Sequence, residues 1–228
     1  MTRRFFYHAL GVGLGGRITR PCCELIDAQA TTALPTVGGY ASSRVDAYRF
    51  RDIVSVRSAW AYAVGSEAGD KDFNASITVT VEGLNILDVI TADSITARLS
   101  SRHVGDKEPV ISSVGSEFRN LRIAGRPVDA EIDSDLFFTA HDYAAFRQAQ
   151  AKQGRPEQWL ESKDKGRVLG SIVKGPTIEV PTVGTVVLGE ILVSQYARRL
   201  TMVRVELGSP VAGRMEFASG EINGYTFP

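Results

Sequence analysis

The sequence has few residues of the kinds that hold metals or build disulfide frameworks. Its 228 residues include two cysteines and three histidines. Cys22 and Cys23 are adjacent, so on an extended strand they point to opposite faces, and a disulfide between them would be strained. Two cysteines cannot form a thiolate zinc site. We therefore expect no metal or other cofactor and no disulfide-framed miniprotein; whether a cysteine pairs between chains stays open.

The sequence also lacks net charge and long apolar runs. The 26 basic residues balance 26 acidic residues, which argues against nucleic acid or an anionic membrane as a partner and leaves little repulsion between copies. No segment approaches the roughly 18 apolar residues of a membrane helix. Residues 1–21 resemble a twin-arginine export signal, but the apolar run is short and is followed by Arg17 and Arg20. We interpret Phe5 to Ile18 as a first strand instead.

Short segments rich in β-branched residues fill most of the chain. Val79 to Ser101 alternates apolar and polar residues and is interrupted by Gly83, as in strands joined by tight bends. The same pattern returns in the last third. We predict an all-β fold of two packed, mainly antiparallel sheets, with a β-solenoid as the alternative. At this length the chain fits a single β-rich domain, residues 1–228.

Residues 54–64 are a strand in which bulky and small side chains alternate. Trp60 and Tyr62 share one parity with the valines, and alanines occupy the other. This pattern predicts that the bulky side chains face the core. Residues 34–43 and 102–109 predict loops, because they are rich in glycine, proline or charge.

The first strand is rich in glycine. Gly11, Gly13, Gly15 and Gly16 lack the spacing of a dinucleotide fingerprint, and no amphipathic helix follows them. A face lined by glycine lets another backbone or a bulky aromatic side chain come close. We therefore interpret these glycines as structural.

Residues 139–165 predict helix rather than strand. Thr139 and Asp142 resemble a capping box, and apolar residues then recur at helical spacing up to Gly154. Pro156 fits the first turn of a second short helix, anchored by Trp159. We expect an insert of two short helices on the rim of the sheet.

Exposed aromatic residues could stack on a sugar, and the candidates are Tyr40, Trp60, Tyr62, Trp159, Tyr196 and Tyr225. Tyr196 lies in a turn predicted at residues 195–199 between two long strands. It is followed there by Arg198 and Arg199. Tyr196, Arg198, Arg199 and Trp159 therefore form the candidate binding surface.

No catalytic residue is predicted. His8, His103 and His141 are far apart in the chain, and none has an identifiable partner for general base catalysis. We interpret His103 as a solvated loop residue and His141 as part of a first helical turn. The serines include no nucleophile elbow.

The carboxylates leave three interpretations open. Asp88 and Asp93 lie five residues apart, and Asp129, Glu131, Asp133 and Asp135 alternate along a later segment. Alternating carboxylates on one strand face could hold Ca²⁺, but an acidic edge that blocks unwanted strand pairing is favoured, because no calcium loop accompanies them. A pair of carboxylates for glycoside hydrolysis is the third interpretation.

Three segments resemble the choice-of-anchor P type of bacterial β-rich surface domain. They are GLNILDVITADSITARL (residues 83–99), GSEFRNLRIAGRPV (115–128) and VGTVVLGE (183–190), in the same order as in that family. The resemblance implies an extracellular or cell-surface location and a structural, non-enzymatic role. It carries over no catalytic residues.

Our first hypothesis is a non-catalytic structural protein that forms homo-oligomers through strand edges or through the glycine-rich first strand. The alternative is a module that binds a carbohydrate or another partner in a cleft lined by Tyr196 or Trp159. A hydrolase is the third hypothesis, and it requires carboxylates that converge in a pocket.

Overall fold

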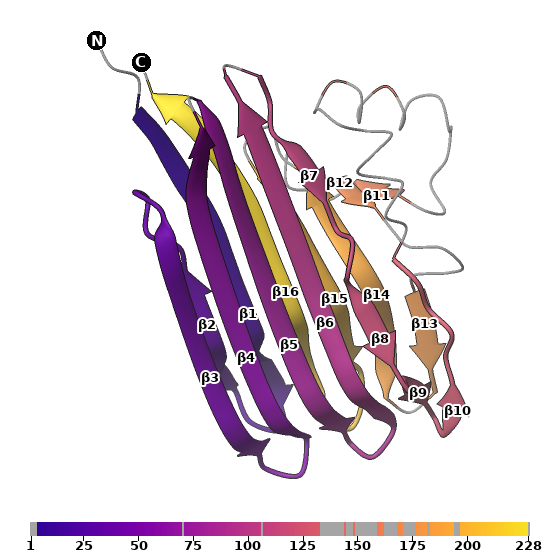
Figure 1. Ribbon diagram of the computed structural model, residues 1–228. Helices are drawn as coiled ribbons and strands as arrows, with labels where there is room; N and C mark the ends of the chain where they lie inside the picture. The colour runs from indigo at the N-terminus through magenta and orange to yellow at the C-terminus, as the bar shows by residue number, and fades with distance from the viewer. Residues whose placement is uncertain are drawn as a thin grey trace.

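The chain folds as a sandwich of two antiparallel β-sheets (Figure 1). The computed structural model describes residues 4–69, 71–105, 107–132, 144, 148, 159–161, 168–170, 177–181, 183–193 and 197–227. The prediction of an all-β fold with two packed sheets is confirmed. The solenoid alternative is wrong, because the long strands pair antiparallel instead of stacking as short parallel rungs.

Sheet A contains both ends of the described chain. Its strand order is β11–β12–β14–β15–β16–β1–β2, and β13 pairs with β14. The strands are β1 (Arg4–Arg20), β2 (Glu24–Ala33), β11 (Trp159–Glu161), β12 (Val168–Gly170), β13 (Thr177–Val180), β14 (Gly184–Val193), β15 (Arg198–Leu207) and β16 (Ala212–Phe227). The expected first strand is confirmed as β1, which lies between β16 and β2.

Sheet B is formed mainly by the first half of the chain. Its order is β10–β9–β6–β5–β4–β3, and β7 and β8 pair with β6 beside β9. The strands are β3 (Gly39–Phe50), β4 (Val54–Gly69), β5 (Asp72–Ile86), β6 (Ile90–Val104), β7 (Val110–Ser112), β8 (Glu117–Arg119), β9 (Arg122–Ile123) and β10 (Arg126–Pro127). In the described residues, β2 and β3 are the long edge strands.

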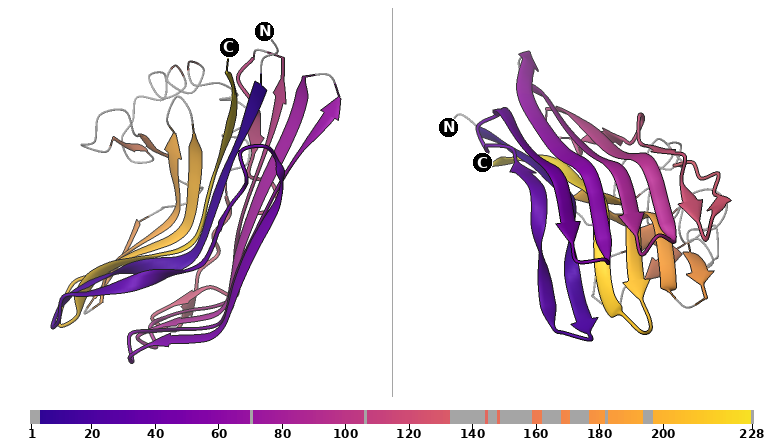
Figure 2. Two further views of the ribbon diagram at one scale, coloured as in Figure 1. Left: turned by 90° about the vertical axis from the view of Figure 1, so that its left-hand side faces the viewer. Right: turned by 90° about the horizontal axis from the view of Figure 1, so that it is seen from below.

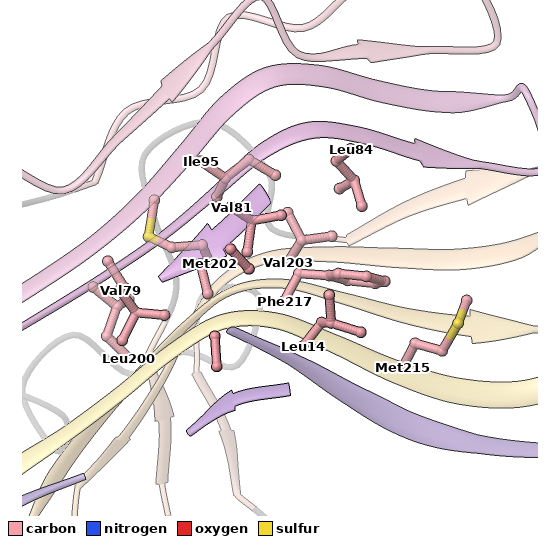
Figure 3. Packing of buried hydrophobic residues seen from close by; sticks show 14 of the residues in the cluster. Leu14, Val79, Val81, Leu84, Ile95, Leu200, Met202, Val203, Met215 and Phe217 are labelled. Atoms are coloured by element: carbon pink, nitrogen blue, oxygen red, sulfur yellow. The ribbon is translucent and has the colours of Figure 1, made fainter. Parts of the chain in front are cut away.

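The core lies between the sheets and is almost entirely apolar. Figure 3 shows Val79 and Val81 of β5 facing Leu200 and Val203 of β15 and Phe217 of β16 across the sandwich. The glycine-rich strand has a structural role. A Cβ on Gly11 would lie 2.9 Å from side-chain atoms of β5, so the missing side chain lets the sheets approach closely.

Every long strand of sheet B bends at one line, which we call crease B. Its members are Ala47, Arg57, Gly83, Asp93 and Asn120, which stand opposite one another between regular pairs on adjacent strands. Ala47, Gly83 and Asn120 have φ values of 52°, 60° and 51°, in the left-handed region. Each bend exchanges the faces of its strand: Val79 and Val81 are buried before Gly83, and Leu84 and Ile86 after it.

Sheet A has a matching line, crease A. Its members are Ala30, Gly13, Ala218, Met202 and Gly189. Ala30, Ala218 and Gly189, on alternate strands, have φ values of 50°, 50° and 58°. Figure 2 shows the result: both sheets bend in the same direction, with sheet A on the inner, concave side and sheet B on the outer, convex side. We call the part between the creases and the chain termini the terminal half.

Crease B overturns the prediction for residues 54–64. Val54 and Val56 face the core, but beyond Arg57 the core side is occupied by Ala59 and the next two alternate alanines. Trp60 and Tyr62 therefore lie on the outer face of sheet B, where Tyr62 is 42% exposed. The alternation of bulky and small residues continues unbroken through Arg57 in the sequence, although the strand exchanges its two faces there.

Three further expectations are corrected in part. The loop predicted at residues 34–43 is shorter, because β3 begins at Gly39, and β6 continues through His103 to Val104. Trp159 lies on β11 rather than in a second helix. Residues 144 and 148 are helical, and the rest of the predicted first helix lies outside the described residues. Within the described residues, no helix has the length and apolarity to cross a membrane.

Candidate functional site

The outer face of sheet B in the terminal half carries small polar side chains in rows across the strands. Register gives the rows as Ser66, Asn74, Arg102 and Val110; Tyr40, Val64, Ser76, Ser100 and Ser112; Ser42, Tyr62, Thr78 and Arg98; and Arg44, Trp60, Thr80, Thr96 and Glu117. Neighbouring members of a row are about 4.8 Å apart, the spacing of strands in a sheet. This face is turned toward the viewer in Figure 1.

The first two rows line a shallow groove of about 380 Å³. Its lining residues are Val64, Ser66, Asn74, Ala75, Ser76, Ser100, Ser101, Arg102, Val110 and Ser112. The groove crosses β4, β5 and β6 and reaches β7, so its floor is a rigid, fully paired part of the sheet. Groups on such a floor are held in place before any ligand arrives, which lowers the entropy lost on binding.

Most polar side chains of the groove are not used by the fold. The side chains of Ser66, Asn74, Ser76 and Ser100 form no hydrogen bond within the described residues. Each hydroxyl is both donor and acceptor, and the amide of Asn74 adds two donors and an acceptor. The groove therefore offers a ligand hydrogen-bonding groups whose present partner is solvent.

One side chain of the groove is fixed by an ion pair. Arg102 donates from Nε to Asp72 Oδ1 at 3.1 Å and from Nη2 to Asp72 Oδ2 at 2.7 Å. These hydrogen bonds and the positive charge lower the pKa of Asp72, although burial acts in the opposite direction, and they raise the pKa of Arg102. The bidentate geometry holds the guanidinium at the end of the groove.

Two tyrosines lie beside the groove. Tyr62 precedes Val64 by two residues on the same face, and Tyr40 pairs with Val64 from the edge strand. Tyr40 is 73% exposed. Both rings thus present apolar surface next to the row of serines, as amphipathic aromatic residues commonly do at binding surfaces.

Nearer crease B, the polar groups of the same face bond to each other. Thr80 and Thr96 share a hydrogen bond of 3.1 Å between their hydroxyls, and Ser58 donates to Glu82 Oε2 at 2.9 Å. These pairs stabilise neighbouring strands. The contrast between paired residues near the crease and unpaired residues in the groove distinguishes the groove as the candidate site.

The concave face of sheet A carries a second polar cluster, centred on crease A. Glu190 and Arg204 come from opposite sides of the crease and form an ion pair, with 3.0 Å between Oε2 and Nε. Arg199 bonds Glu216, also across the crease, and Arg204 bonds Glu206. Burial raises the pKa of Glu190, and Glu216 adds to this; Arg204 and Arg214 act in the opposite direction.

The positive and negative charges of this concave cluster balance one another. Arg199, Arg204 and Arg214 face Glu190, Glu206 and Glu216, so the described groups are electrically neutral together. Two of the pairs, Glu190 with Arg204 and Arg199 with Glu216, join the two sides of the bend, so their direct effect is to hold the bend closed. We assign the cluster a structural role.

The described histidines have structural partners. His8 lies 2.9 Å from Glu221 across β1 and β16. His103, expected in a solvated loop, is only 5% exposed; its Nε2 bonds Gly105 O at 2.8 Å, and its ring packs beside Phe5. The loop prediction failed because β6 extends over the end of the core. His141 lies outside the described residues.

The predicted carboxylates that the structure describes do not converge. Asp88 lies in the β5–β6 turn and accepts a hydrogen bond from Asn85, while Asp93 accepts one from Asn120 at crease B. Asp129 and Glu131 are exposed, and Asp133 and Asp135 lie outside the described residues. Among the described residues, no group of three or more His, Cys, Asp or Glu is placed to hold a metal ion.

The turn proposed as a binding surface is placed only in part. Arg198 and Arg199 belong to β15, not to the turn. Arg198 is 5% exposed and lies 3.9 Å from Glu108, and Arg199 is half-buried against Ser219 and Glu216. Tyr225 lies on β16, opposite Phe6 of β1. Tyr196 and the side chains of Tyr225 and Trp159 are outside what the structure describes.

The groove residues were missed because each is unremarkable in sequence. Ser66 falls in a segment that reads as a polar turn, and Ser100 ends a strand of ordinary alternation. Only the register of four strands brings them together. The available signal was the polar alternate positions of residues 74–80 and 96–102, which predict an outer face made of small hydrogen-bonding residues.

The class defined by this geometry is a bent, two-sheet β-sandwich with a polar groove on its convex face. The sequence model of a family described as Domain of unknown function (DUF8256) matches residues 5–168, well over half of the chain, so the chain belongs to that family. The match includes all of the groove. No curated protein and no solved structure matches the chain.

Proposed function

We propose that this protein is a non-catalytic binding module that holds a carbohydrate in the groove on the convex face of sheet B. The observation that carries the proposal is the set of four side chains, Ser66, Asn74, Ser76 and Ser100, on a rigid floor, which form no hydrogen bond in the part of the chain that the structure describes. Sugar hydroxyl groups are donors and acceptors, as these side chains are. The exposed ring of Tyr62 adds an apolar surface on which a sugar ring can pack.

The shape of the site fits an extended ligand. The groove is open along the surface and crosses four strands, so a linear polymer can lie across it without a conformational change in the sheet. A shallow polar site of this kind gives modest affinity for a single sugar unit, because each exchanged hydrogen bond contributes only about 1 kcal/mol. Several units in register across the rows add their contributions.

The test is a titration of purified protein with soluble polysaccharides, preceded by a glycan array. Ser76→Ala and Ser100→Ala are each expected to weaken binding about fivefold, the equivalent of one lost hydrogen bond. Ser94→Ala is the matched control, because Ser94 lies on the same face of β6 but outside the groove. Absence of binding, or equal losses in Ser94→Ala and Ser100→Ala, contradicts the proposal.

Self-association through strand edges remains a prediction. The edge strands β2 and β3 are both long, which favours it. However, β3 is bent at Ala47 and carries charged pairs such as Arg44 with Asp46, features that discourage pairing of edges. The glycine-rich strand is not available for this role, because β1 is paired on both sides.

A further inference from the structure

The charged side chains along the rim of the groove differ in one respect: among the described residues, Arg102 has an acidic partner and Arg98 has none. Arg102 is bound by Asp72 through two hydrogen bonds. Arg98 is exposed, lies on the same face of β6 two residues from Ser100, and has no ion pair or side-chain hydrogen bond within the described residues. It therefore supplies an uncompensated positive charge next to the groove.

The structure holds Arg98 in place by two contacts. The hydroxyl of Ser116 accepts from the backbone N–H of Arg98 at 2.8 Å and donates to its carbonyl at 3.0 Å, which fixes the backbone. The stem of the side chain passes Gly115, where a Cβ would lie 3.1 Å from Arg98 Cδ. With a φ of +92°, residue 115 also favours glycine for its own conformation.

The row through Arg98 also contains an aromatic ring. Register places Tyr62, Thr78 and Arg98 side by side on β4, β5 and β6. Tyr62 and Arg98 are thus separated by two strand spacings, about 10 Å. A polymer lying along this row meets an aromatic surface at one end and a guanidinium at the other, with the serines of the groove alongside.

We infer that the ligand is an acidic polysaccharide and that Arg98 recognises its carboxylate or sulfate groups. The inference rests on the proposed function, since it names the class of glycan for the same groove. A guanidinium presents a planar fork of donors that matches both anions. Charge complementarity favours an acidic over a neutral chain, because the carboxylate of Asp72, which is bonded at the end of the groove, is already neutralised by Arg102.

The experiment measures binding of the full chain to polygalacturonate, dextran sulfate, neutral dextran and polyglutamate by calorimetry at low and high salt. We expect one of the two acidic polysaccharides to bind at least about tenfold more tightly than dextran, with affinity falling as salt rises. Which of the two binds better identifies carboxylate or sulfate as the recognised group.

Variants separate the inference from the proposed function. Arg98→Gln is expected to reduce affinity for the acidic polymer about tenfold and leave dextran binding unchanged, and Arg98→Lys is expected to restore part of the loss. Arg122→Gln, which removes one positive charge from β9 of the same sheet, is the control for net charge. Circular dichroism of each variant checks the fold.

Each outcome has one meaning. Equal binding of dextran and acidic polymers, or equal losses in Arg98→Gln and Arg122→Gln, overturns the inference and leaves the proposed function standing. Binding of polyglutamate as tight as that of the polysaccharides overturns the assignment to a glycan. If no polysaccharide binds, the proposed function itself fails.

Discussion

Gly13 and Ala59 face each other across the core at the point where the two creases meet. A Cβ on Gly13 would lie 3.0 Å from the Cβ of Ala59 and 2.9 Å from the Cβ of Ala30. Gly13 belongs to crease A, and Ala59 follows crease B by two residues. The bend therefore depends on small side chains at the place where the sheets are closest.

A side chain at position 13 should force the sheets apart at the bend. We expect Gly13→Val to lower the free energy of unfolding by about 2–3 kcal/mol, in the range of overpacked cores. Urea unfolding followed by circular dichroism measures this. Gly15→Ala is the control on the same strand, where the new Cβ would lie 3.3 Å from the nearest atom. Equal stability of wild type and Gly13→Val would show that the sheets are not in close contact there.

Replacing a crease alanine with glycine should affect stability differently from replacing an alanine in a regular stretch of strand. Ala47 has a φ of 52°, a conformation that costs a non-glycine residue about 1 kcal/mol. Ala47→Gly should therefore leave stability unchanged or raise it slightly, because relief of strain offsets the lost entropy. Ala41→Gly, six residues earlier on the same strand, should lose about 1 kcal/mol. The two changes are compared by thermal unfolding; a larger loss at Ala47 contradicts a left-handed conformation there.

The strand content could be predicted from sequence because alternation acts locally. Val79 to Ser101 predicted two or three short strands joined by tight bends, and the structure has two long strands there, β5 and β6, joined by a turn at Asp88. The faces could not be predicted in the same way. Gly83 signalled an irregularity, but Ala47 and Ala218 carry no sign of a left-handed conformation, so the creases and the outward position of Tyr62 stayed hidden.

The candidate site depended on long-range register, which no local pattern contains. Ser76 and Ser100 are adjacent only because β5 and β6 pair around a turn of fixed length, and Ser112 joins them through β7. The predicted turn with Arg198 failed for a related reason: two adjacent arginines suggest exposure, yet alternation on β15 sends Arg198 toward the interior side. The charge of a residue therefore does not determine which face of a strand its side chain occupies.

Light scattering with size-exclusion chromatography tests the prediction of self-association. If β3 pairs with a second copy, the measured mass should rise with protein concentration, because edge pairing is intermolecular. Tyr40→Lys should reduce it, since Tyr40 is exposed near the start of this edge strand and lysine protects edges. A monomer at every concentration would contradict self-association and leave the groove as the proposed binding surface.

The bend should become less stable as pH rises through the titration of Glu190. Burial raises the pKa of this carboxyl above its usual 4.5, so the folded state binds a proton more tightly than the unfolded chain does. The contribution of this group to stability is then fully present below about pH 4.5 and is lost as pH rises through the folded pKa. The Glu190→Gln variant has no titratable group at this position, so it does not lose this contribution to stability as pH rises.

The free energy of unfolding of wild type and Glu190→Gln should therefore be measured in urea at a series of pH values. We expect the stability of the variant relative to wild type to rise with pH above about 4.5 and then to level off. The other charges at crease A, on Arg199, Arg204, Arg214, Glu206 and Glu216, are present in both proteins and largely cancel in the difference. Thr201→Val, a neutral change in the same row, should shift stability equally at every pH. A pH-independent difference for Glu190→Gln would mean that Arg204 compensates the buried carboxylate fully.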